Sequence, residues 1–242
     1  MFTHTSLIIA IIVLAVGSAW SIFKNKLTRL AGLSAFLVGL AIYICDGWSG
    51  LAILAAFFIM ATLATSHKKE KKATLEAKQR HPEKRKAGQV FANGGIAALS
   101  GIMVLFFPSY DVMFALMMAS AISAATADTL ASELGMVYGR NAINILTFKR
   151  EAKGLDGVVS AEGTLLGLIG SCIIGLIYCT FHSFHVDIFL IIVVAGTLGN
   201  LVDSLLGALL ERKRIIGNNV VNLLNTITGA LVAMVACMLL LR

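Results

Sequence analysis

Eight apolar segments, each 16 to 23 residues long and free of Lys and Arg, constrain this chain more than any other feature. A bilayer core of about 30 Å requires roughly 20 apolar residues in helical form. Because lipid offers the backbone no hydrogen bonds, such segments must be helices or barrel strands, and barrel strands alternate in polarity as these runs do not. The sequence therefore predicts an all-α, polytopic transmembrane helix bundle with about eight spans. The segments are Ser6–Phe23, Leu30–Cys45, Gly47–Thr65, Val90–Phe107, Val112–Leu130, Thr164–Thr180, Ile188–Leu210 and Val220–Leu241.

Two of these segments raise separate questions. The second, Leu30–Cys45, is short and is joined to the third through Asp46, so a re-entrant hairpin is an alternative to two full spans. The first has no Lys or Arg before it, whereas Lys24, Lys26 and Arg29 follow it, which is the reverse of a secretory signal. We expect an uncleaved anchor whose N-terminus lies outside.

Basic residues alternate between the loops. Of the 20 Lys and Arg residues, 19 follow the first, third, fifth and seventh segments, and the intervening loops carry none. This positive-inside pattern predicts cytoplasmic basic loops, extracytoplasmic termini and a location in the cytoplasmic (plasma or inner) membrane. The net charge of +7 therefore indicates topology and no nucleic-acid partner. The predicted organisation is a single membrane domain over 1–242, with a basic cytoplasmic linker at 67–87 near anionic headgroups and a cytoplasmic loop at 135–160.

Polar side chains gather at the predicted cytoplasmic ends of the segments. A carboxylate at the centre of a membrane helix costs about 2.5–3.5 kcal/mol on insertion scales, so Asp128 and Asp203 are candidates for function. Transporters bind solutes near the midplane, whereas an enzyme joining a lipid headgroup to a soluble cosubstrate needs its groups at one face. The distribution favours the enzyme. The candidates for substrate or nucleotide binding are Asn93, Gly94, Thr129, Glu133, Ser160, Asn200, Ser204, Asn222 and Asn225.

Helical spacing places several of these residues together. Asn200, Asp203 and Ser204 stand at i, i+3 and i+4 and share one face, and Asn218, Asn222 and Asn225 share another. Hydrogen bonding and close packing between helices are the alternative role for the amide, hydroxyl and glycine residues. A simple interfacial charge is the alternative for Glu133.

Oxygen-rich groups beside basic loops suit Mg²⁺, which is typically held by one or two carboxylates and substrate phosphates. Asp128 and Asp203 lie in similar strings, and we expect them to share the ion across one pocket. Lys149 and Arg150, with Arg140 and Lys153 in the same loop, would neutralise phosphate charge, and the Gly-rich segment 154–163 would offer backbone N–H groups. None of the five histidines lies in the polar clusters, and no Walker-type loop is present. The two similar strings also suggest an internal duplication, which is common in transporters.

The strings that carry these residues resemble an integral-membrane family typified by animal transmembrane protein nineteen and the plant phytyl-phosphate kinase of vitamin E salvage. The resemblance covers about residues 30–242, and its most specific strings read ADTLASELG and VDSLLGA. The chain departs from the family pattern at Leu155 and Val158. The matching stretches are 92–95, 125–135, 147–149, 157–160, 199–208 and 222–226.

The resemblance implies a CTP-dependent kinase that converts an isoprenoid (prenyl- or phytyl-type) monophosphate to its diphosphate at the cytoplasmic membrane face. Its partners would be the lipid phosphate, CTP, Mg²⁺ and membrane lipids, with Asp128, Asp203, Lys149 and Arg150 as catalytic candidates. Two alternatives stay open. One is a transporter or flippase of a lipid phosphate, and the other is a membrane cytidylyltransferase, which would release pyrophosphate instead of CDP.

Overall fold

The computed structural model describes residues 3–75 and 84–240. It confirms an all-α polytopic bundle, in which seven helices of the described residues are long and apolar enough to cross a membrane. Part of the predicted linker at 67–87, including Lys78 and Arg80, lies outside the described residues. The helices are α1 (His4–Phe23), α2 (Arg29–Ser66), α3 (Lys69–Leu75), α4 (Ala87–Phe106), α5 (Asp111–Tyr138), α6 (Ala161–Phe181), α7 (Val186–Leu206) and α8 (Asn218–Leu240).

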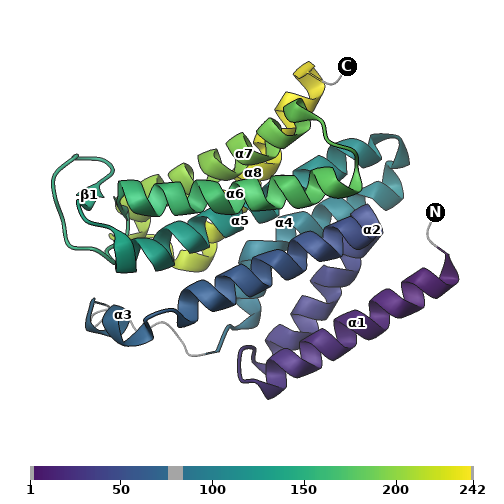
Figure 1. Cartoon of the computed structure of the whole chain (residues 1–242), viewed down its shortest axis with the longest axis horizontal. Coiled ribbons are helices and arrows are strands. Elements are labelled where there is room, and N and C mark those ends of the chain that lie inside the picture. The colour runs from purple at the N-terminus through teal and green to yellow at the C-terminus, as the bar shows by residue number, and fades with distance from the viewer. Residues whose placement is uncertain (1–2, 76–83, 241–242) are drawn as a thin grey trace.

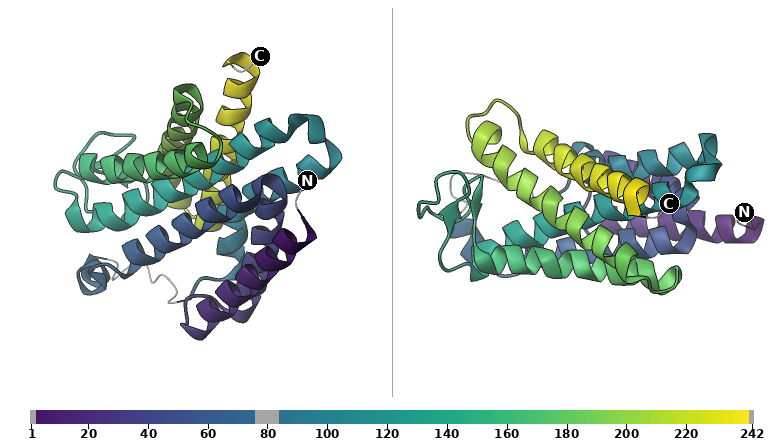
Figure 2. Two further views of the ribbon diagram at one scale, coloured as in Figure 1. Left: turned by 45° about the vertical axis from the view of Figure 1, so that its right-hand side comes forward. Right: turned by 90° about the horizontal axis from the view of Figure 1, so that it is seen from above.

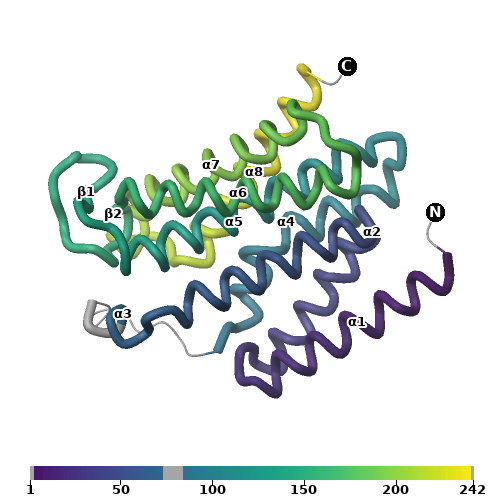
Figure 3. Tube along the Cα trace, in the orientation of Figure 1, coloured from purple at the N-terminus to yellow at the C-terminus, as the bar shows by residue number. Residues whose placement is uncertain are grey.

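Shorter elements connect the helices. The turn η1 (Pro108–Tyr110) leads into α5, and the π-helical turn η2 (Gly207–Glu211) continues α7. Between α5 and α6, strands β1 (Ile143–Asn144) and β2 (Val158–Val159) form an antiparallel pair. Figure 3 traces this excursion at one end of the bundle.

Helix α2 is bent double and contains two of the predicted segments. Asp46 and Gly47 have non-helical dihedral angles, with a φ of 58° at Gly47. A Cβ placed on Gly50 would lie 2.9 Å from the carbonyl oxygen of Ile42, although eight residues of straight helix would separate them by about 12 Å. The chain therefore reverses at Asp46–Gly47, and the eight predicted segments pack as seven helices (Figure 1). The arms, residues 29–45 and 48–66, are about 26 and 29 Å long at 1.5 Å per residue. Both are close to the roughly 30 Å of a bilayer core, which favours two spans over a re-entrant hairpin.

The two ends of the bundle differ in charge. The turns after α1, α2, α5 and α7 carry the basic residues and lie at one end, whereas both described termini lie at the other (Figures 1 and 2). The alternation in the sequence is thus a real separation in space. The membrane face toward which each end points stays a prediction.

Helix α5 is the centre of the bundle and packs against α2, α4, α6, α7 and α8. Its small residues allow this, because Ala119, Ala124 and Ala125 are fully buried. A Cβ placed on Gly167 of α6 would lie 2.7 Å from the carbonyl oxygen of Ala127, so the two helix backbones nearly touch. Small residues at helix contacts are the usual means of close approach in membranes.

We predict that Gly101→Ala destabilises the protein, because a Cβ there would overlap the carbonyl oxygen of Ala41 and force α4 away from α2. Overpacking of this kind costs about 1–3 kcal/mol. The matched control is Gly95→Ala on the same helix, where the nearest atom to the new Cβ, Phe91 Cβ, is 3.9 Å away. Thermal unfolding of both variants in nanodiscs measures the difference, and equal unfolding temperatures would contradict it.

A second prediction concerns the end with the termini, where His182 Nε2 lies 2.8 Å from Asp46 Oδ1. The hydrogen bond to Asp46 raises the pKa of His182, although burial opposes this. Because the folded pKa exceeds the unfolded value of about 6.5, this stabilisation is fully present below that pH and is lost as pH rises through the folded pKa. We expect the unfolding temperature of the wild type to fall toward that of His182→Gln as pH rises through that range. Parallel pH profiles of the two proteins would refute the prediction.

Candidate functional site

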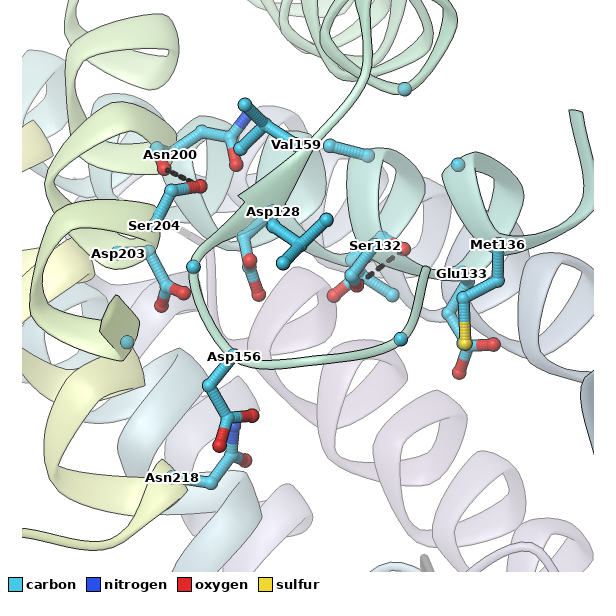
Figure 4. A pocket seen from close by; sticks show the side chains of 18 of the residues that line it. Asp128, Ser132, Glu133, Met136, Asp156, Val159, Asn200, Asp203, Ser204 and Asn218 are labelled. Atoms are coloured by element: carbon cyan, nitrogen blue, oxygen red, sulfur yellow. Dashed lines mark hydrogen bonds between the residues drawn. The ribbon is translucent and has the colours of Figure 1, made fainter. Parts of the chain in front are cut away.

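A polar pocket of about 260 Å³ lies at the end of the bundle that carries the basic loops. Its walls come from the last turn of α2, the first turns of α4, α6 and α8, the C-terminal part of α5, and α7 with η2. The segment from Lys153 to Ser160 forms another wall (Figure 4). The pocket therefore collects residues from most of the chain.

Most of the predicted site residues line this pocket. As helical spacing predicts, Asn200, Asp203 and Ser204 lie on one face of α7, and this face lines the pocket (Figure 4). Asp128 and Glu133 are five residues apart and therefore lie on different sides of α5, which continues as a helix to Tyr138. Because both residues line the pocket, the site is broad. The predicted residues that line it are Asn93, Asp128, Thr129, Glu133, Ser160, Asn200, Asp203, Ser204 and Asn222.

Four of the catalytic and binding candidates do not line the pocket. Gly94 faces α2, where a Cβ would lie 2.8 Å from Val38 Cγ1, and Asn225 is fully buried with its Nδ2 donating to the carbonyl oxygen of Ala124 at 3.4 Å. Lys149 and Arg150 lie outside because the loop folds back on itself between α5 and α6. The backbone N–H of Asn144 donates to the carbonyl oxygen of Lys149 at 2.9 Å, and the backbone of Arg150 forms an isolated antiparallel β-bridge with Ile143.

Other lining residues were missed by the sequence analysis. Of the basic residues expected near the phosphates, Lys153 lines the pocket, whereas Arg140, Lys149 and Arg150 do not. Arg85 also lines it, and it could not be singled out from a run of basic residues. Helical spacing could have found Gln89, four residues before Asn93. The charged and amide lining residues that were not singled out are Arg85, Gln89 and Glu211.

The structure brings Asp128 and Asp203 together. Their carboxyl groups come from α5 and α7 and lie next to one another in the pocket (Figure 4). Asp203 Oδ2 is buried and has no hydrogen-bond partner among the described residues. Two carboxylates in a medium of low polarity repel each other unless a proton or a cation lies between them.

The residues of the pocket fit a hard cation. Besides the Asp pair, the buried amide oxygens of Asn93 and Asn222 have no hydrogen-bond partner in the described part of the chain. No group of three or more His, Cys, Asp or Glu side chains in that part is placed to hold a metal. A divalent ion here would therefore take further oxygen ligands from water or phosphate, as Mg²⁺ does.

The loop from Lys153 to Ser160 packs tightly against η2 and forms one side of the pocket. Gly154 and Gly157 have positive φ angles of 82° and 74°, which side chains disfavour. A Cβ on Gly157 would overlap Ala208 in η2, so only glycine permits this approach. Val158, a departure from the family pattern, pairs with Asn144 in the short sheet and is accommodated there.

The carboxylate of Glu133 is bound by side chains of α3 and of the end of α2. Lys72 of α3, almost fully buried, places its Nζ 2.5 Å from Glu133 Oε2 and also donates to the carbonyl oxygens of Ala64 and Thr65. The hydroxyl of Thr65 donates to Glu133 Oε1 at 2.8 Å. Glu133 therefore anchors α3 to α5 and the end of α2. Its predicted role in substrate binding stays a prediction.

Comparison with known proteins gives one family. Residues 10–230 match the family described as integral membrane protein DUF92. An uncharacterized membrane protein of Methanocaldococcus jannaschii is 36% identical over 235 residues, which cover 96% of this chain and 94% of that protein. An uncharacterized membrane protein of a Synechocystis species is 30% identical, covering 87% of this chain and 82% of that protein.

A plant relative is longer. The chloroplastic protein VTE6 of Arabidopsis thaliana is 29% identical over 206 residues, which cover 83% of this chain but only 62% of the plant protein. The chain thus spans less than two thirds of that relative. No solved structure matches.

We predict that Lys72→Ala destabilises the protein by about 3–5 kcal/mol, because it leaves the Glu133 carboxylate without its cation and two carbonyl oxygens without their donor. The control is Glu70→Gln, an exposed charge on the same short helix, which should change the unfolding free energy by less than about 0.5 kcal/mol. Denaturant titration of both variants in mixed micelles measures these changes. Similar free energies for the two would show that the ion pair does not anchor α3.

Proposed function

We propose that this chain, which belongs to the family described as integral membrane protein DUF92, is a prenyl-phosphate kinase. The residues of the chain that match the family, 10–230, include every residue that lines the pocket. It transfers a phosphoryl group from CTP to an isoprenoid monophosphate and forms the diphosphate. The observation that carries this proposal is the facing pair Asp128 and Asp203, with unsatisfied oxygens beside them and two cations in the same pocket.

The acceptor chemistry suits the side chains present. A phosphate monoester is already ionised at neutral pH, because its second pKa is about 6, so no general base is needed. None of the described residues that line the pocket is a histidine. The task is instead to neutralise charge and hold the phosphates in line.

The proposed reaction balances without an added proton carrier. An oxygen of the acceptor phosphate attacks the γ-phosphorus of CTP, and a new P–O bond forms. The bond from the γ-phosphorus to the β–γ bridging oxygen breaks, and CDP leaves with that electron pair. Mg²⁺ bound at Asp128 and Asp203 would supply the positive charge that shields the phosphates. Lys153 and the Gly154–Gly157 turn would position the donor triphosphate, and the amides of Asn93 and Asn222 would orient the phosphates.

A transporter is less well supported by the packing. The interior of the bundle beyond the pocket is filled by apolar side chains that are fully buried, among them Leu116, Ile122 and Ile192. The lining polar groups lie at one end of the bundle. This arrangement supports chemistry at one face, which we propose to be the cytoplasmic one.

The test uses purified protein in nanodiscs with CTP, Mg²⁺ and prenyl monophosphates of several chain lengths. We expect CDP and the prenyl diphosphate as products. Pyrophosphate in place of CDP would identify a cytidylyltransferase. The absence of both products with every lipid would overturn the enzyme proposal and leave transport to be measured.

We predict that Asp128→Asn and Asp203→Asn each lower turnover by roughly 10²-fold or more while the protein stays folded, because each removes charge without changing size. The matched control is Asp187→Asn, the same substitution at an exposed position at the far end of α7, which should keep full turnover. Product formation and thermal unfolding are measured on the same samples. Normal turnover in either pocket variant would remove that residue from the mechanism.

A further inference from the structure

Arg85 is a cation of the pocket for which the described residues provide no ion-pair partner. It is partly buried, and its Cζ lies 6.0 Å from the ring centroid of Phe57 on α2. Burial lowers the pKa of the Arg85 side chain, and the charge of Glu133 offsets this only in part. A cation–π contact at this distance uses none of the N–H donors of the guanidinium, so they can bind an anion.

The nearby carboxylate is already committed elsewhere. Both oxygens of Glu133 are engaged, one by Lys72 and the other by Thr65. Because Glu133 is neutralised from outside the pocket, the charge of Arg85 is left for a ligand. A partly desolvated charge without a partner is costly, so a bound anion would be stabilising.

The backbone of Arg85 is held in place before any ligand arrives. Its N–H donates to the carbonyl oxygen of Lys26 at 3.0 Å, and its own carbonyl oxygen accepts from the N–H of Thr28 at 3.1 Å. These bonds tie the start of α4 to the turn between α1 and α2. The backbone from which the cation extends is thus held by the fold.

The wall that carries Arg85 is the amphipathic one. It is built from α2 and α4, whose other faces carry exposed apolar side chains such as Leu30, Leu63 and Phe91. The wall around Lys153 is instead a loop that contains two glycines of positive φ. A lipid phosphate needs a cation beside an apolar surface, whereas a soluble triphosphate suits the loop.

We propose that Arg85 binds the phosphate monoester of the lipid acceptor, at a subsite separate from that of the nucleotide. This inference rests on the proposed function for the identity of the acceptor. The guanidinium would form two parallel hydrogen bonds with one phosphate, and the lipid chain would lie along α2 and α4.

The test is direct binding of geranylgeranyl monophosphate to the full chain in neutral phosphatidylcholine nanodiscs, without nucleotide. We expect Arg85→Ala to weaken binding at least tenfold and Arg85→Lys to restore it only in part, since an ammonium cannot make the paired bonds. The matched control is Arg29→Ala, an exposed arginine just beyond the same turn that does not line the pocket, which should bind normally. Thermal unfolding checks that each variant is folded.

Further arms separate the possible outcomes. Geranylgeraniol, which lacks the phosphate, should bind weakly and equally to the wild type and Arg85→Ala. Equal displacement by inorganic phosphate or by phosphatidylglycerol would assign the site to any phosphate group and overturn the proposal, as would unchanged lipid binding by Arg85→Ala. Because no nucleotide is present, failure of CTP turnover alone does not affect this result. Normal turnover with intact lipid binding in Arg85→Ala would reject the proposed role of Arg85 and leave the proposed kinase activity unaffected.

Discussion

The mutual repulsion of two carboxylates in a poorly polar interior is the constraint on which the rest of the site depends. Asp128 and Asp203 meet only because α5 and α7 approach closely, and small side chains on both helices make that approach possible. Gly199 of α7, for example, has so little space that a Cβ would lie 2.6 Å from Ala124 Cβ. The close packing of α5 and α7 thus brings like charges together, which is costly unless a cation compensates them.

The sequence predicted much of the fold for a simple physical reason. Lipid allows few solutions for an apolar segment, so segment length and the placement of Lys and Arg indicate helices and the separation of the two ends. It did not show that α2 is one bent element, because the reversal depends on the dihedral angles of Asp46 and Gly47. The apolar pattern alone is the same for two spans joined by a tight turn.

The candidate site was predictable where it lies on helices and unpredictable where it lies on loops. Asn200, Asp203 and Ser204 follow from helical periodicity, which holds over the whole of α7. Lys149 and Lys153 were both expected near the phosphates from their sequence neighbourhood, but only Lys153 lines the pocket, because the backbone at Lys149 folds back against Asn144. Loop conformation depends on single glycines and on tertiary contacts such as Gly157 against Ala208, which periodicity does not encode.

Mn²⁺ binding shows whether Asp128 and Asp203 hold one divalent cation between them. Electron paramagnetic resonance of the protein in nanodiscs measures free and bound Mn²⁺ during a titration, independently of any turnover. We expect a saturable site in the wild type and in Asp187→Asn that is lost in both Asp128→Asn and Asp203→Asn. Unchanged Mn²⁺ affinity in the two pocket variants would contradict it and leave the pair joined by a proton instead of a metal.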